Sequence, residues 1–147
     1  LIGKERKTTE VMIYAVIDTN VLVSALLSRN PYSATVLVVN AISKTRICPL
    51  YNYEIITEYK DVLSRAKFNF PAQAVESIIN KILEIGTNAN RVHSPEIFQD
   101  ADDVVFYEVA LSKEDAFLVT GNTKHFPKNP IVVTPAEMLE ILKQLET

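Results

Sequence analysis

Apolar runs and helix-like periodic segments alternate along the whole chain. Residues 13–17 are continuously apolar, which is typical of a strand buried on both faces. A similar run covers 116–120, shorter strands are predicted at 46–50 and 131–133, and 90–93 is an edge strand or an extended segment. Between these runs, apolar residues at intervals of three and four predict helices over about 21–27, 33–42, 54–66, 72–85, 102–112 and 135–145.

Strands that alternate with helices predict an α/β fold, in which helices cover both faces of a parallel sheet. A chain of 147 residues suits one domain with a substantial core. Met12 directly precedes the first predicted strand. We therefore expect a single domain over residues 12–147, with residues 1–11 as an N-terminal extension or a leader added in cloning.

Polar residues follow both long apolar runs. Asp18, Thr19 and Asn20 come directly after the first run, and residues 120–123 end the second. The carboxyl ends of parallel strands are where open α/β sheets bind ligands. A helix N-cap is the simplest alternative for the first group. One cap, however, accounts for only one of three consecutive polar residues.

Acidic residues are concentrated in two further segments. Asp100, Asp102 and Asp103 begin a predicted helix, where capping explains one or two of them. Three carboxylates so close together repel one another and require solvent or a cation. Glu54, Glu58 and Asp61 share the polar face of another helix with Arg65. Helix register alone does not distinguish Glu58 from Glu54 or Asp61 as a site residue.

The residue composition limits which metal ions and substrates such a site could bind. Carboxylate, amide and hydroxyl oxygens suit Mg²⁺ or Mn²⁺, whereas one cysteine and two histidines give little support to zinc. Only three glycines are present, and none lies in a phosphate-binding loop. The net charge of −3 argues against a broad basic surface for duplex DNA but leaves a short single strand possible.

Two further properties bear on where the protein works. Cys48 is the only cysteine, so no disulfide forms within the chain, and we expect a cytoplasmic protein. No apolar stretch reaches the 18 residues of a membrane span, so no membrane association is expected.

Four short motifs together resemble a known family. They are Val-Ile-Asp-Thr-Asn-Val-Leu at 16–22, Glu-Tyr-Lys-Asp-Val-Leu at 58–63, Asp-Ala-Asp-Asp at 100–103 and Leu-Val-Thr-Gly-Asn at 118–122. In this order and at this spacing, from Met12 to about Leu142, the chain resembles PIN-domain proteins of the VapC-like kind, the ribonuclease toxins of toxin–antitoxin systems. The resemblance implies a three-layer α/β/α sandwich with a central parallel sheet of four to five strands. It also implies metal-dependent hydrolysis of single-stranded RNA.

The resemblance also implies roles for individual residues and partners. Asp18, Glu58 and Asp103 match the acids that bind Mg²⁺ or Mn²⁺ and carry catalysis, and Thr19, Asn20 and Thr120 match the polar residues that support them. Asn122 stands where the family commonly has a fourth acid, so its metal ligation is weaker, and Asp100 or Asp102 are substitutes. A homodimer and a small antitoxin protein that blocks the acidic pocket are further expectations.

Other interpretations of these residues remain open at this point. The chain is alternatively a catalytically silent PIN-like module that binds RNA or protein, which Asn122 favours. A third alternative is a phosphatase or phospho-receiver domain with Asp18 as nucleophile, although Asn20 stands where a haloacid-dehalogenase-type phosphatase needs an aspartate. Lys124 and His125 either contact a phosphate or are solvated. Core packing and base stacking are alternative roles for three tyrosines, Tyr51, Tyr53 and Tyr59.

Overall fold

Five parallel strands form one sheet at the centre of the molecule. The structure is a computed structural model that describes residues 11–146, so the predicted leader lies almost entirely outside the described residues. The strand order is β3-β2-β1-β4-β5. Their bounds are β1 Ile13–Ile17, β2 Ile47–Tyr51, β3 Thr87–Asn88, β4 Phe117–Val119 and β5 Val132–Val133.

Six α-helices in the described range surround this sheet. They are α2 Thr19–Leu27, α3 Ala34–Ser43, α4 Tyr53–Leu63, α5 Ala72–Ile85, α6 Ala101–Leu111 and α7 Pro135–Gln144, with a 3₁₀ turn, η1, at Thr123–His125. Within the described part of the chain, no helix has the length and apolar character needed to cross a membrane.

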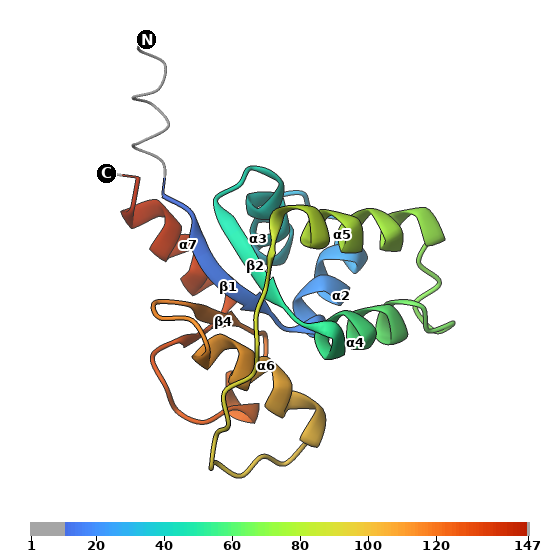
Figure 1. The fold of residues 1–147 in the computed structure, drawn as a ribbon. Helices are drawn as coiled ribbons and strands as arrows, with labels where there is room; N and C mark the ends of the chain where they lie inside the picture. The colour runs from blue at the N-terminus through green and yellow to red at the C-terminus, as the bar shows by residue number, and fades with distance from the viewer. Residues whose placement is uncertain (1–10, 147) are drawn as a thin grey trace.

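The strand order places helices on both faces of the sheet. From β1 the chain moves to β2 and β3, then returns across the sheet to β4 and β5 on the other side of β1. Because parallel crossovers are right-handed, the two directions of travel put their helices on opposite faces. Figure 1 shows α6 on one side and α2, α3 and α5 on the other. The predicted three-layer α/β/α sandwich is confirmed.

The carboxyl-terminal part of the central strand is fully buried, as the unbroken apolar run predicts, whereas Ile13 and Tyr14 are partly buried. Ala15, Val16 and Ile17 have no exposed surface, because β1 lies between β2 and β4 and between two helical layers. The pairing of β1 with β4 ends at Ile17 opposite Val119. The residues after these two strands therefore emerge side by side at the same edge of the sheet.

Side-chain caps fix where two of the helices begin. Asn52 accepts a hydrogen bond from the Ile55 backbone N–H at 2.9 Å and begins α4. Thr134 and Glu137 form a capping box, and Pro135 occupies the first turn of α7. Both helices begin within one residue of the predicted starts at 54 and 135.

Three details of the prediction are corrected. The strand predicted at 46–50 runs from Ile47 to Tyr51 and passes through Pro49. It tolerates the proline because β3 pairs only with Leu50 and Tyr51, so the side of β2 at Pro49 has no neighbouring strand that needs a donor. The edge strand is Thr87–Asn88, and residues 90–93 are irregular. The helix predicted to reach residue 66 ends at Leu63.

Gly86 is required by close packing rather than by an unusual backbone angle. Its φ of −80° is accessible to any residue. A Cβ atom there would lie 2.4 Å from the Pro49 carbonyl oxygen and 2.5 Å from that of Ile82. The glycine therefore lets the end of α5 approach β2 closely enough for β3 to join the sheet.

Gly86→Ala is expected to lower the free energy of unfolding by about 1–3 kcal/mol, the usual cost of overpacking. The clash is with backbone atoms, which do not move aside easily. Gly121→Ala is the matched control, because its nearest contact would be Asn20 Oδ1 at 3.6 Å. Urea unfolding of both variants checks this, and equal effects would contradict the packing argument.

Candidate active site

Asp18 lies at the carboxyl end of the central strand. Its backbone N–H donates to the Val119 carbonyl at 2.9 Å, so the residue continues the β1–β4 ladder by one position. The next residue already belongs to α2. Asp18 is only 7% exposed, so its carboxylate is held in a largely dry environment.

Hydrogen bonds from the neighbouring loop orient the Asp18 carboxylate. Thr120 Oγ1 donates to Asp18 Oδ2 at 2.7 Å, and Asn20 Nδ2 donates to the same oxygen at 3.2 Å. Asn20 Oδ1 in turn accepts from the Gly121 N–H at 3.1 Å. Asp18 occupies the N-cap position of α2 without a side-chain cap hydrogen bond, so simple capping does not explain it.

Burial raises the pKa of Asp18 above its ordinary value. The hydrogen bond from Thr120, the nearby backbone N–H groups of Thr19 and Asn20 and the charge of His125 act in the opposite direction, but burial outweighs them. An ionised Asp18 is thus poorly compensated by the protein itself. A bound cation would supply the missing compensation.

The three aspartates at the start of α6 have different surroundings. Asp100 Oδ1 accepts from the Asp102 N–H at 2.9 Å and is the N-cap. Asp103 turns inward, and its side chain is 16% exposed. Burial first, and then the charges of Asp18 and Asp100, raise its pKa to about 6. Asp103 is therefore the α6 carboxylate most strongly coupled to Asp18.

Of the three acids on the polar face of α4, Glu58 is the one without a basic partner. Glu54 pairs with Arg91 at 2.9 Å and Asp61 with Arg65 at 3.1 Å. Glu58 has no hydrogen bond or ion pair with any described residue. Burial raises its pKa, followed by the charge of Asp102. The charge of Arg65 acts in the opposite direction, and Asp61 and Asp18 add smaller effects that raise the pKa.

Glu58 and Asp102 line one groove between α4 and α6, with a volume of about 410 Å³. The charges of Asp18, Asp103 and Glu58 thus act on one region, although they come from three distant segments. Among residues 11–146, however, no three His, Cys, Asp or Glu side chains are close enough to hold a metal ion together. The charges of these carboxylates therefore act on a common region, but the side chains do not form a complete set of metal ligands.

The chemistry of the donors nevertheless fits a hard divalent cation. All candidate ligands are oxygens, and the acids raise one another's pKa. Thr19 Oγ1 is buried and has no hydrogen-bond partner within the described residues. Asp18, Asp103 and Glu58 are therefore the candidates to hold Mg²⁺ or Mn²⁺.

The loop after β4 carries the remaining predicted site residues. The Asn122 N–H donates to Thr120 Oγ1 at 3.0 Å, so its backbone contacts the hydroxyl group that orients Asp18. The side chain of Asn122 is exposed. His125 Nδ1 lies 3.8 Å from Asp103 Oδ2, a long contact in which the imidazole is about half exposed. Lys124 is exposed and forms no ion pair with a described residue.

Near this site, Glu108 did not stand out in the sequence pattern, whereas Tyr59 did, with two alternative roles. Glu108 is 5% exposed and forms ion pairs and hydrogen bonds with Arg91. The sequence feature that could have identified Glu108 is its position in the middle of an apolar helical segment. An acidic residue that is buried there requires a cationic partner. Tyr59 is fully buried and donates to the Ile17 carbonyl at 2.5 Å, which places it in the core rather than among candidates for base stacking.

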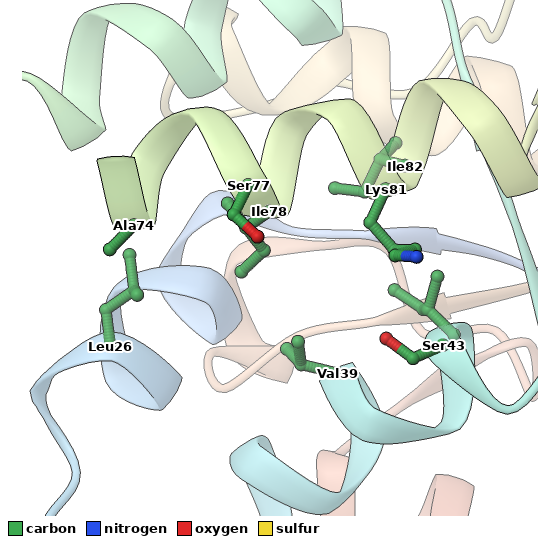
Figure 2. Close-up of a pocket in the computed structure, with 9 residues that line it drawn as sticks. Leu26, Val39, Ser43, Ala74, Ser77, Ile78, Lys81 and Ile82 are labelled. Atoms are coloured by element: carbon green, nitrogen blue, oxygen red, sulfur yellow. The ribbon is translucent and has the colours of Figure 1, made fainter. Parts of the chain in front are cut away.

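A second hollow lies away from these acids. Figure 2 shows it between α5 on one side and α2 and α3 on the other. Its volume is about 280 Å³, and it is lined by apolar side chains such as Leu26, Val39 and Ile78, with Lys81 beside them. Because no carboxylate lines it, this hollow is unsuited to binding a divalent metal ion.

Asp103→Asn is expected to raise the melting temperature of the metal-free protein at pH 7. A folded-state pKa of about 6, against an ordinary value of 3.8, means that folding favours the protonated form. The stabilisation from Asp103 is thus complete below pH 3.8 and is lost as the pH rises through 6. Thermal unfolding from low to neutral pH in EDTA should show a difference between variant and wild type that appears over this range. A difference independent of pH would contradict the assignment.

The comparisons with known proteins agree with this geometry. A family model described as a PIN domain matches residues 14–124, which covers β1 through η1. Neither the curated proteins nor the solved structures gave a match. Members of the matched family are generally nucleases that use divalent metal ions. Since the match spans most of the chain, including most of the sheet and all four motifs, this chain belongs to the PIN-domain family.

Proposed function

We propose that this protein is a metal-dependent endoribonuclease that hydrolyses phosphodiester bonds of single-stranded RNA. The observation that carries the proposal is the buried Asp18 carboxylate, oriented by Thr120 and Asn20 and coupled in charge to Asp103. A purely structural aspartate would have a basic partner or a complete set of cap hydrogen bonds. Asp18 has neither among the described residues, which fits a ligand for a cation.

Each side chain has a distinct task in this proposal. When bound, Mg²⁺ or Mn²⁺ supplies an activated water and stabilises charge on the phosphoryl group. Asp18 and Asp103 hold the ion, Thr120 and Asn20 prevent Asp18 from rotating, and Glu58 adds negative charge from α4. Lys124 and His125, exposed beside the site, contact a substrate phosphate.

Substrate class follows from charge and from the resemblance to ribonucleases. A chain with net charge −3 lacks the many lysine and arginine contacts that bind duplex DNA tightly. A single strand needs fewer such contacts when a metal ion binds the scissile phosphate. The resemblance to VapC-like proteins extends the proposal to a cytoplasmic toxin that works as a homodimer and is blocked by a small antitoxin protein.

The second candidate function is a silent module that binds RNA or a protein without cleavage. Asn122 favours it, because an amide replaces the charged group that the family commonly has at this position. Its exposed side chain has no negative charge with which to attract a second metal ion. RNA binding without cleavage at any Mg²⁺ or Mn²⁺ concentration would select this alternative.

Asp18→Asn, Asp103→Asn and Glu58→Gln are each expected to reduce cleavage of single-stranded RNA at least ~100-fold, equivalent to about 2.7 kcal/mol of transition-state stabilisation. Asp61→Asn is the control, since it removes a charge that Arg65 already neutralises. Cleavage assays with Mg²⁺, Mn²⁺ and EDTA check this. Full RNA cleavage by Asp18→Asn would overturn the role proposed for Asp18. A beryllofluoride adduct on Asp18 would instead favour a phosphatase.

Asn122→Asp is expected to lower the metal concentration that gives half-maximal cleavage by several-fold. An added carboxylate next to Thr120 increases the Coulomb attraction for a divalent cation. Asn80→Asp makes the same charge change on the exposed surface of α5 and should have no effect. Equal metal dependence in both variants would show that residue 122 is not a metal ligand.

A further inference from the structure

A three-residue ion-pair network joins the two helices that carry acids of the proposed site. Arg91 is its centre: the guanidinium contacts Glu108 of α6 through Nε and Nη2, both at 2.8 Å. Through Nη1 it contacts both carboxylate oxygens of Glu54 of α4, at 3.0 and 2.9 Å. We call Glu54, Arg91 and Glu108 the arginine clasp.

The α6 end of the clasp is rigid. Glu108 is 5% exposed, and both its carboxylate oxygens are used, because Oε2 accepts from the Ser94 N–H at 2.8 Å. The Val92 N–H also donates to the Glu108 carbonyl at 3.1 Å. Burial by itself would raise the pKa of Glu108, but the Ser94 N–H and Arg91 outweigh it, and the pKa is lowered. The pair is therefore ionised.

Arg91 lies in a segment that has no helix or strand of its own. Between β3 and α6 the chain runs as an irregular trace past the start of α4 and along α6, coloured yellow in Figure 1. Its position depends on contacts such as those of the clasp rather than on a regular ladder of hydrogen bonds. One guanidinium that satisfies two carboxylates is suited to this, because arginine donates in a fixed planar fork.

The clasp adjoins the groove that contains Glu58 and Asp102. Glu54 lies one helical turn before Glu58 on α4, so both side chains project from the same face. Arg91 lines the groove together with both of these acids. Away from the groove, α4 and α6 also meet through the buried rings of Tyr59 and Phe106, whose centroids are 6.2 Å apart.

We propose that the arginine clasp sets the separation of α4 and α6 and thereby positions Glu58 for the metal ion held by Asp18 and Asp103. Arg91 is a positioning residue in this scheme and does not touch the substrate or the metal. The inference rests on the proposed function, since it assigns the clasp a role in that same site. It also accounts for a fully satisfied guanidinium in a groove that is otherwise acidic.

The test variant is Glu54→Ala, which releases α4 from the clasp and leaves the pair between Arg91 and the buried Glu108 intact. Glu54 is about half exposed, so the variant is expected to fold. Asp61→Ala is the matched control, because it removes one carboxylate from the same helix and the same groove but breaks only a local ion pair with Arg65, just after α4. Arg91→Met, which leaves Glu108 buried without a partner, is made as a second variant.

Mn²⁺ affinity, measured by calorimetry on the full chain, gives a readout independent of RNA cleavage. Glu54→Ala is expected to raise the Mn²⁺ Kd about 5- to 10-fold, and Asp61→Ala less than 2-fold, where tenfold corresponds to about 1.4 kcal/mol. In a Glu58→Gln background, Glu54→Ala should have no further effect, because its influence passes through Glu58. Arg91→Met should weaken Mn²⁺ binding at least as much as Glu54→Ala does.

The outcomes separate this inference from the proposed function. Equal Kd values for Glu54→Ala and Asp61→Ala, or additive effects of Glu54→Ala and Glu58→Gln, would overturn the clasp alone and leave it a purely stabilising contact. If wild-type protein binds no Mn²⁺, the proposed metal site itself fails and the clasp has nothing to position. If Glu58→Gln binds Mn²⁺ as tightly as wild type, Glu58 is not a donor, and the clasp inference fails while a site at Asp18 and Asp103 stands.

Discussion

The adjacency of β1 and β4 is the constraint on which the site depends. Asp18 and Thr120 are 102 residues apart, yet each follows directly on one of two paired parallel strands. The hydrogen bond from Thr120 Oγ1 to the Asp18 carboxylate can form only because the register of the ladder ends both strands at the same level. Any change that shifted β4 by one residue would turn Thr120 away and leave a buried carboxylate with a single side-chain donor.

This arrangement also explains why the acidic region opposes the stability of the fold. Burial raises the pKa of Asp18, Glu58 and Asp103, and repulsion from neighbouring carboxylates, Asp18 included, adds to this effect at Glu58 and Asp103. A protein selected only for stability would have neutral or paired side chains there. A bound cation would relieve the repulsion between unpaired carboxylates at this edge of the sheet. That relief favours binding of the cation, which explains why such carboxylates are retained.

Much of the fold followed from local pattern. The bounds of β1 and the caps of α4 and α7 were predictable, since each depends on apolar continuity or on a single capping side chain. The continuation of β2 through Pro49 and the position of β3 were not predictable. Both depend on the short stretch over which β2 and β3 pair, and the local sequence does not define that stretch. For the candidate site, Asp18 and its support by Thr120 followed from the ends of two buried strands. Glu58 could be separated from Glu54 and Asp61 only once Arg91 and Arg65 had fixed positions in space.

The buried hydroxyl of Tyr59 has a consequence for any attempt to transfer this chemistry to another scaffold. It bonds the carbonyl of Ile17, so a single contact joins the residue after Glu58 to the residue before Asp18. Burial raises the pKa of Tyr59, and the hydroxyl therefore keeps its proton and remains a donor in alkaline solution. A design that transferred only the acidic residues would omit this buried hydrogen bond, which aligns the backbones next to Glu58 and Asp18. The set of residues to transfer is therefore the acids together with Tyr59.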